Sequence, residues 1–338
     1  MVCTVVVGGF WGDEGKGKII SYLAVKDHVK IGVRGGVGPN AGHTVQHQGR
    51  TLRLRMLPSA VVNAEARLLV GAGVLVDPAR FLEEVDLAEA RGRAGLDPNC
   101  AIIEPKHVAA DRSSNHLAGK IGTTGTGTGP CNSDRVQRKA KTAKEIPELQ
   151  DFLADVALEV NEALDKGENV LVEGTQGTFL SLYHGTYPYV TSKDVTASAV
   201  CSDVGIGPTR VDEVLIVFKA YVTRVGQGPL PGELSWEEAE RRGWAETATV
   251  TGRRRRAAPF NLELARRAVM LNGATQAAIT KLDVLYPECR GATSYESLPQ
   301  EARKFVSRVE EALGIPVTLL GTGPETFQIV DLEREKGA

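Results

Sequence analysis

Cysteine is scarce in this chain, and its spacing argues against the usual cysteine-based sites. No two of the five cysteines form a Cys-x-x-Cys pair; they stand at Cys3, Cys100, Cys131, Cys201 and Cys289. A zinc site or a disulfide framework is therefore not expected. Reduced thiols are the simpler interpretation, and they predict a cytoplasmic protein.

Long apolar runs and a dominant charge are also missing. No run approaches the roughly 20 apolar residues of a membrane span, and the chain opens directly into a β-type run that leaves no room for a signal peptide. The formal net charge is -2, so no global basic field favours nucleic acid. We expect neither a membrane nor a nucleic acid among the partners.

Glycine, in contrast, is plentiful, and its 37 copies gather in short runs typical of phosphate loops and tight turns. The length of 338 residues fits two domains or one large α/β unit. Because nothing marks a domain boundary, we predict a single domain over residues 1–338.

Apolar, β-branched runs alternate with helical patterns along the chain. Strands are expected at 3–7, 30–34, 68–70, 169–173, 214–222, 276–282 and 315–320. Helices are expected at 77–94, 146–166, 261–271 and 299–313, and Ser235 starts a capping box. This alternation predicts an α/β fold with a large, mostly parallel central sheet covered by helices and carrying long functional loops.

The segment 8–19 follows the first strand and has the composition of a phosphate-binding loop. Such loops hold phosphates through backbone N–H groups and the dipole of the following helix, which favours a P-loop-NTPase-like sheet. The match to G-x-x-x-x-G-K consists of Gly12, Gly17 and Lys18. Ile19 stands where Ser or Thr would hold magnesium, so Asp13 is a candidate magnesium ligand, proton acceptor or both. The alternative is an ordinary turn with solvated charges.

Three later loops carry polar side chains. Residues 34–44 contain four glycines and present Asn40 and His43, and a neutral histidine can donate to a phosphate or purine oxygen. Residues 121–130 alternate Gly and Thr, which suits a small anion. Residues 173–178 follow a strand, where ligands bind in open α/β sheets. Their amide and hydroxyls suit a neutral heterocycle and a phosphate.

Two segments near the C-terminal end suggest an acidic co-substrate and a guanine nucleotide. Residues 253–256 are four consecutive arginines, and a guanidinium group can form bidentate hydrogen bonds to a carboxylate or a phosphate. Lys281 and Asp283 resemble the base-reading element of GTP-binding proteins, in which the aspartate accepts from guanine N–H groups that adenine lacks. Residues 321–323, at the next strand end, could close the same base pocket.

Six motifs in order resemble those of the adenylosuccinate synthetase family, over residues 2 to about 330. They occupy residues 11–18, 40–44, 121–125, 184–191, 251–256 and 280–285. The resemblance implies a GTP-dependent ligase with one Mg²⁺ per subunit and GTP as co-substrate. GTP phosphorylates the 6-oxygen of IMP, and the amine of L-aspartate then displaces that phosphate to give adenylosuccinate, GDP and phosphate.

The resemblance also implies roles for single residues. Asp13 would take the N1 proton of IMP and would bind magnesium together with the Gly42 carbonyl. His43 would donate to the phosphoryl group or the 6-oxygen. Gln176 would hold the purine. The residues implied for GTP are Gly12, Glu14, Gly15, Lys16, Gly17, Lys18, Gly42, His43, Thr44, Arg255, Lys281, Asp283, Gly321, Thr322 and Gly323. Those for IMP are Asp13, Lys16, Asn40, Ala41, Thr124, Arg138, Gln176, Thr191 and Arg253. Those for aspartate are Thr249, Val250, Thr251, Gly252, Arg253 and Arg255.

The resemblance further implies a homodimer in which Arg138 reaches the neighbouring site. The helical stretch after Arg138 and the segment 285–321 are shorter than in the longer members, so the chain resembles a compact form. Many members have Thr where Val250 stands, so one hydroxyl contact to aspartate would be lost.

Three other functions compete with this interpretation, and the sequence argues against one of them. A regulatory GTP-binding switch would use Lys281 and Asp283 but would not need the arginine run. A dinucleotide-binding oxidoreductase needs G-x-G-x-x-G, which fails because Ile20 stands at the last glycine position. A nucleic-acid binder would use the four arginines.

Overall fold

The computed structural model describes residues 2–247 and 252–336 and centres on a nine-stranded sheet. All neighbouring strands are parallel except β15 and β16, which are antiparallel. The spatial order is β16 (Ile329–Asp331), β15 (Val317–Gly321), β14 (Gln276–Thr280), β10 (Glu213–Lys219), β1 (Cys3–Gly8), β9 (Val170–Glu173), β2 (Ile31–Arg34), β5 (Arg67–Val70) and β7 (Ala94–Leu96). The prediction of a large, mostly parallel sheet is confirmed.

Helices bury both faces of this sheet. Val5 and Val7 of β1 pack into one apolar cluster and Val6 packs into the other, which explains why the strand is apolar throughout. Helices α1 (Lys16–Lys26) and α2 (Pro78–Leu87) contribute to the cluster that contains Val6. The opposite cluster draws on α5 (Val156–Asp165), α6 (Ala197–Val204), α8 (Leu262–Asn272) and α10 (Gln300–Leu313).

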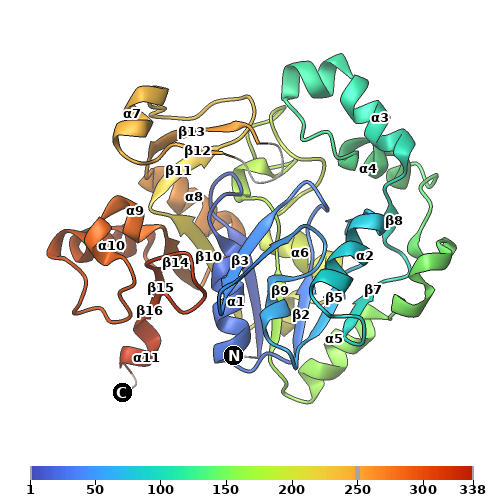
Figure 1. Cartoon of the computed structure of the whole chain (residues 1–338), viewed down its shortest axis with the longest axis horizontal. Helices are drawn as coiled ribbons and strands as arrows, with labels where there is room; N and C mark the ends of the chain where they lie inside the picture. The colour runs from blue at the N-terminus through green and yellow to red at the C-terminus, as the bar shows by residue number, and fades with distance from the viewer. Residues whose placement is uncertain (1, 248–251, 337–338) are drawn as a thin grey trace.

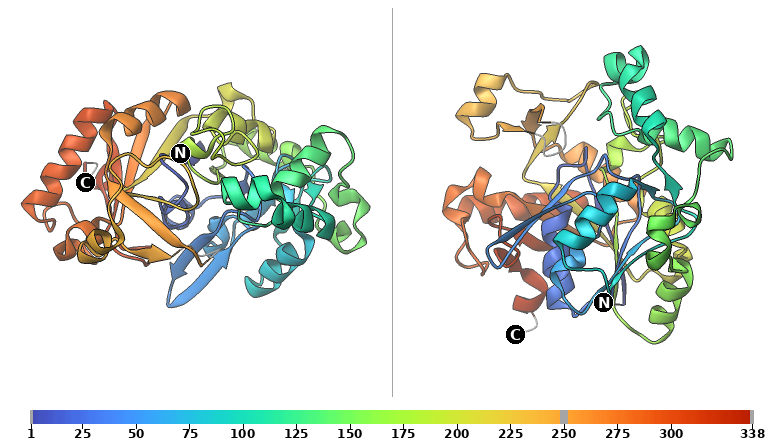
Figure 2. Two further views of the ribbon diagram at one scale, coloured as in Figure 1. Left: turned by 90° about the horizontal axis from the view of Figure 1, so that it is seen from above. Right: turned by 45° about the vertical axis from the view of Figure 1, so that its right-hand side comes forward.

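Smaller elements stand on the carboxyl ends of the central strands. A three-stranded sheet contains β11 (Tyr221–Arg224), β13 (Arg254–Pro259) and β12 (Glu246–Thr247), and α7 (Trp236–Arg241) accompanies it. In both Figure 1 and Figure 2, this group lies on the opposite side of the molecule from α3 (Pro105–Ser113) and α4 (Thr128–Val136). The remaining elements are β3 (His43–His47), β4 (Arg50–Leu54), β6 (Leu75–Val76), β8 (Ala101–Ile102), α9 (Leu282–Leu285) and α11 (Leu332–Lys336). In the described ranges, no helix is long and apolar enough to cross a membrane.

Several element boundaries differ from the sequence-based expectation. The helix expected at 146–166 is divided, because Asp155 caps a new helix by accepting the N–H of Leu158, and residues 147–152 form a separate 3₁₀ turn. The helix expected at 77–94 ends at Leu87, just before Glu89 with its left-handed φ of 52°. The strand expected at 214–222 breaks at Ala220 into β10 and β11.

Candidate active site

The chemistry-bearing segments meet at the carboxyl edge of the sheet. The phosphate loop follows β1, and residues 174–176 follow the adjacent β9. On the other side of β1, Lys219 ends β10, and Lys281 follows β14. Because parallel strands end at one edge, residues far apart in sequence face one space there.

The phosphate loop is held from within by a buried ion pair. The Glu14 carboxylate accepts the N–H groups of Phe10 (2.9 Å) and Gly12 (2.7 Å), and its second oxygen lies 3.1 Å from Lys16 Nζ. Glu14 and Lys16 are 1% and 2% exposed, so the alternative of a turn with solvated charges is wrong. Gly12 and Gly15 have φ values of 100° and 82°, a backbone region that favours glycine.

This pair predicts the effect of removing Glu14. The Glu14→Ala variant leaves a buried ammonium without its charged partner, so we expect the free energy of unfolding to fall by about 3–5 kcal/mol. Chemical denaturation measures it. The double variant Glu14→Ala/Lys16→Met removes both charges and should recover part of that loss, whereas equal losses in the two variants would contradict a stabilising pair.

Asp13 lies in a second charged cluster with residues from β10 and the three-stranded sheet. Its Oδ1 is 3.0 Å from Arg255 Nη2. Glu246 accepts from the other Arg255 nitrogen and from Lys219 Nζ at 3.1 Å, and it also bonds the Tyr221 hydroxyl. Burial raises the pKa of Asp13, although Arg255 and Lys219 oppose this. Burial alone would raise the pKa of Glu246, but Lys219 and Arg255 hold it below its usual range.

His43 packs against the phosphate loop. A Cβ added to Gly17 would come within 3.2 Å of His43 Cβ, so only glycine allows this approach without a shift. The His43 ring bonds Glu173 through Nδ1. Burial lowers the pKa of His43 more than the Glu173 carboxylate raises it.

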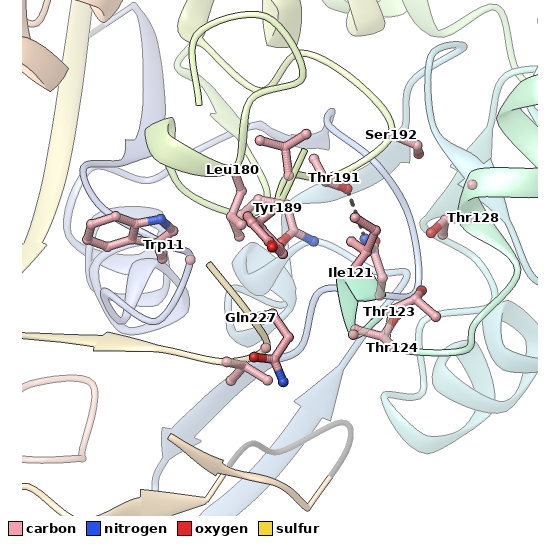
Figure 3. A pocket seen from close by; sticks show the side chains of 18 of the residues that line it. Trp11, Ile121, Thr123, Thr124, Thr128, Leu180, Tyr189, Thr191, Ser192 and Gln227 are labelled. Carbon is pink, nitrogen blue, oxygen red and sulfur yellow. Dashed lines mark hydrogen bonds between the residues drawn. The ribbon is translucent and has the colours of Figure 1, made fainter. Parts of the chain in front are cut away.

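A cavity of about 310 Å³ joins these parts. Figure 3 shows Trp11 and Leu180 on one side of it and the hydroxyls of Thr123, Thr124 and Thr191 on the other. The predicted site residues that line the cavity are Gly12, Asp13, Asn40, Ala41, Gly42, His43, Thr124, Gln176, Thr191, Arg253 and Arg255. The structure therefore brings together residues from five of the six sequence motifs.

Several buried polar atoms on the cavity wall have no hydrogen-bond partner among the described residues. They are Trp11 Nε1, Asn40 Oδ1, Gln176 Nε2, Ser192 Oγ, Arg224 Nε and Arg255 Nε. Buried polar groups are normally paired, and each one left unpaired costs about 1–3 kcal/mol. This set of amide, hydroxyl, indole and guanidinium atoms fits a polar ligand of the size of a nucleotide.

The residues expected to read guanine lie beside the phosphate loop and outside that cavity. Thr280, at the end of β14, donates its hydroxyl to the Glu14 carbonyl at 2.6 Å. Lys281 follows with a left-handed φ of 60°, and Asp283 is 6% exposed. A Cβ added to Gly321 would lie 3.2 Å from Lys18 Cε, so residues 321–323 adjoin the first turn of α1.

Lys18 is the clearest pH-sensitive group at this end of the site. Its Nζ donates to the Glu325 carbonyl, and burial lowers its pKa to about 7 despite the carboxylates of Asp283 and Glu325. The sequence predicts GTP at this loop, and a bound polyphosphate would favour the charged ammonium, so GTP binding above pH 7 would take up a proton. We expect GTP affinity to fall by up to about tenfold per pH unit above 7. Titration calorimetry from pH 7 to 9 measures this, and equal pH dependence in Lys18→Met would contradict it.

Other predicted residues lie away from the cavity. Arg138 is exposed just after α4 and does not line the cavity of its own chain. Gly252 and Thr44 are also exposed. Thr249, Val250 and Thr251 lie outside the described residues.

Each of the four arginines at 253–256 contacts another residue of this chain. Arg253 donates to the carbonyls of Gly122 and Thr123. Arg254 stacks over the Trp236 ring at 4.4 Å, Arg255 joins the Asp13 cluster, and Arg256 pairs with Glu233. Four arginines with internal partners are a poor nucleic-acid patch.

Sequence reasoning did not find every residue of the site. Lys219 and Glu246 complete the Asp13 cluster, and Arg224 and Gln227 line the cavity. Lys219, like Glu173, is the charged residue at the end of an apolar strand, and this position could have marked it as a site residue. Glu246 has no such signal, because its role depends on β12 pairing with β13.

Comparison with known sequences identifies the family. The sequence model of the family described as adenylosuccinate synthetase matches residues 5–148 and 140–288. The chain belongs to the adenylosuccinate synthetase family. It is 60% identical to the adenylosuccinate synthetase of Archaeoglobus fulgidus over 99% of this chain and 100% of that one. It is 58% identical to the Methanocaldococcus jannaschii adenylosuccinate synthetase, covering 99% of this chain and 98% of that one.

Solved structures confirm the family's fold. The fully ligated adenylosuccinate synthetase of Plasmodium falciparum has a TM-score of 0.92 at 24% identity, covering 98% of this chain and 100% of that one. The succinoaminodeoxyadenylate synthetase of cyanophage S-2L has a TM-score of 0.80 at 24% identity, covering 99% and 97%. Membership in this synthetase family decides against the regulatory switch and the oxidoreductase.

Proposed function

We propose that this chain is an adenylosuccinate synthase, which joins IMP and L-aspartate at the expense of GTP. The single observation that carries the proposal is family membership at 52–60% identity over nearly the whole chain. The reaction gives adenylosuccinate, GDP and phosphate through 6-phosphoryl-IMP. Phosphorylation is needed because the 6-oxygen of hypoxanthine is otherwise a poor leaving group.

In the proposed first step, Asp13 takes the N1 proton of IMP while the 6-oxygen attacks the γ-phosphate of GTP. This role is supported by the place of Asp13 on the cavity wall and by its raised pKa, which makes the carboxylate a better base. The unpaired Gln176 amide nitrogen is available to hold the purine. His43 donates to the phosphoryl group or to the 6-oxygen, where negative charge develops.

In the proposed second step, the aspartate amine attacks C6 and expels the phosphate. Arg253, on the cavity wall, would bind the carboxylates of aspartate with residues 249–252. Arg255 forms ion pairs with both Asp13 and Glu246. When substrates bind, Arg255 would leave Asp13 and contact a substrate instead.

The donors present fit a magnesium ion. Asp13 and the Gly42 carbonyl lie on the same cavity wall beside the phosphate loop. Mg²⁺ prefers oxygen ligands and is commonly held by one or two carboxylates together with substrate phosphates. When bound, the ion would neutralise charge on the transferred phosphate.

GTP would lie with its phosphates on the phosphate loop and its base at Lys281 and Asp283. The contact between Gly15 and Thr280 supports this, because a Cβ on Gly15 would come within 3.1 Å of the Thr280 hydroxyl. Glu14, Lys16 and Lys18 would act from the same loop, and Gly321, Thr322 and Gly323 would close the base pocket.

We also propose a single domain and a homodimer that shares its sites. The one central sheet draws strands from β1 to β16, which supports a single domain. Arg138 is exposed and away from its own cavity, which supports a role in the site of a second copy, at the phosphate of IMP beside Asn40, Ala41, Thr124 and Thr191.

The proposal is tested by product formation with purified protein. The ultraviolet absorbance of the purine changes when its 6-substituent changes, so the rate can be followed directly. We expect product only when IMP, aspartate, GTP and magnesium are all present. GTP cleavage that is indifferent to IMP and aspartate would overturn the ligase assignment.

A further inference from the structure

A buried polar cluster lies beneath the cavity, between the ends of β2 and β9. Its members are Arg34, His43, Ser59 and Glu173. His43 is 6% exposed and the other three are fully buried. Charges at such depth cost several kcal/mol unless they are matched, and here the Arg34 guanidinium and the Glu173 carboxylate are matched through Arg34 Nη1, while Arg34 Nε and Nη2 have no partner among the described residues.

Apart from His43, each polar atom of the described residues that contacts the Glu173 carboxylate is a donor. Ser59 donates its N–H to one oxygen and its hydroxyl to the other at 3.0 Å, and Arg34 Nη1 lies 3.5 Å from the oxygen that His43 contacts. Burial alone would raise the pKa of Glu173, but His43 and Arg34 hold it below its usual range. Because the carboxylate is ionised and only accepts, His43 Nδ1 carries the hydrogen of their bond.

The direction of that bond fixes the imidazole ring. With Nδ1–H bound to Glu173, Nε2 is the ring nitrogen left for the cavity that His43 lines. We infer that Glu173 is a positioning residue, which holds His43 Nε2 toward the reacting phosphoryl group while Arg34 and Ser59 hold Glu173. This inference rests on the function proposed above and adds a residue to its machinery. A ring without such an anchor could turn about Cβ and present carbon instead of nitrogen.

Glu84 provides a matched control. It is also a buried carboxylate, 2% exposed, and it accepts the N–H groups of Arg55, Met56 and Leu57. It does not line the cavity and does not contact His43. Glu84→Gln therefore tests the loss of a buried charge without the loss of a histidine anchor.

Steady-state kinetics provide the first test. In Glu173→Gln we expect kcat for adenylosuccinate formation to fall by about 10- to 100-fold, by analogy with the loss of groups that orient metal-ligating histidines. The KM values for IMP and GTP should change by less than about threefold, because the His43 contact would strengthen mainly in the transition state, as charge develops on the transferred phosphoryl group. Glu84→Gln should keep kcat even if its melting temperature falls. A kcat in Glu173→Gln within about threefold of wild type would overturn the inference.

Proton NMR of histidine-labelled protein provides a second test that does not require activity. The hydrogen-bonded Nδ1–H of His43, assigned by its loss in His43→Asn, should be seen in wild type and Glu84→Gln and be lost in Glu173→Gln. Its persistence in Glu173→Gln, or its absence from wild type, would overturn the inference even if the ligase activity holds. Should Glu173→Gln fail to fold, Glu173→Asp keeps the charge on a shorter stem, and an unchanged kcat there would have the same meaning.

Discussion

Asp13→Asn is expected to fold normally and to lose nearly all turnover, with kcat reduced by about 10²- to 10⁴-fold. The substitution keeps the shape of the side chain, whose exposed fraction is 16%, and an amide can still bond Arg255. It removes the basic oxygen that would take the N1 proton of IMP. It also removes the charge that would bind magnesium. The measurement is the initial rate of adenylosuccinate formation at saturating IMP, aspartate and GTP.

Glu233→Gln is the control for Asp13→Asn. Glu233 also pairs with an arginine of the same run, Arg256, but it lies away from the cavity. Its loss should leave kcat nearly unchanged. If Asp13→Asn has a kcat close to that of wild type, the proposed role of Asp13 as base and metal ligand is wrong.

Mixing Arg138→Leu with Asp13→Asn is expected to restore activity that neither variant has alone. If Arg138 serves the partner's site, each mixed dimer holds one site with both residues intact. Random exchange makes half of the dimers mixed, so recovery should approach about one quarter of wild-type activity. The measurement is the rate after the two proteins are unfolded and refolded together.

The matched control is Arg138→Leu mixed with His43→Asn, which should give the same recovery because His43, like Asp13, lines the cavity of its own chain. Mixing Asp13→Asn with His43→Asn should give none, since each mixed dimer then has two damaged sites. Recovery in the second mixture, or none in the first pair, would contradict the shared site.

The parts of the fold found from sequence are those with local signals. Apolar runs bounded by glycine-rich loops located the central strands, because a strand buried on both faces is apolar throughout, as β1 is. The helix break at Asp155 was missed because the helical spacing of apolar residues continues across it. The only sign of the break is Asp155 itself, which caps the second helix. The hairpin β3–β4 was missed since its turn uses Gln48 and Gly49, both with positive φ, within a polar stretch.

The sequence predicts a site residue when that residue belongs to a short motif with a recognisable chemical role. It does not predict contacts between residues that are far apart in the sequence. The place of Asn40, Gln176 and Thr191 on one cavity wall followed from their loops. The Glu173–His43 bond joins residues 130 apart and depends on β2 lying beside β9. The link from Asp13 to Glu246 depends likewise on the three-stranded sheet standing over β10.

The most direct test of the account is to follow the 6-oxygen of IMP. IMP labelled with ¹⁸O at that position is incubated with the protein, aspartate, GTP and magnesium in unlabelled water, and the released phosphate is analysed by mass spectrometry. If GTP phosphorylates the 6-oxygen and aspartate then displaces it, each phosphate carries one ¹⁸O for each adenylosuccinate formed. Unlabelled phosphate would mean that GTP is hydrolysed by water and that no 6-phosphoryl intermediate lies on the path.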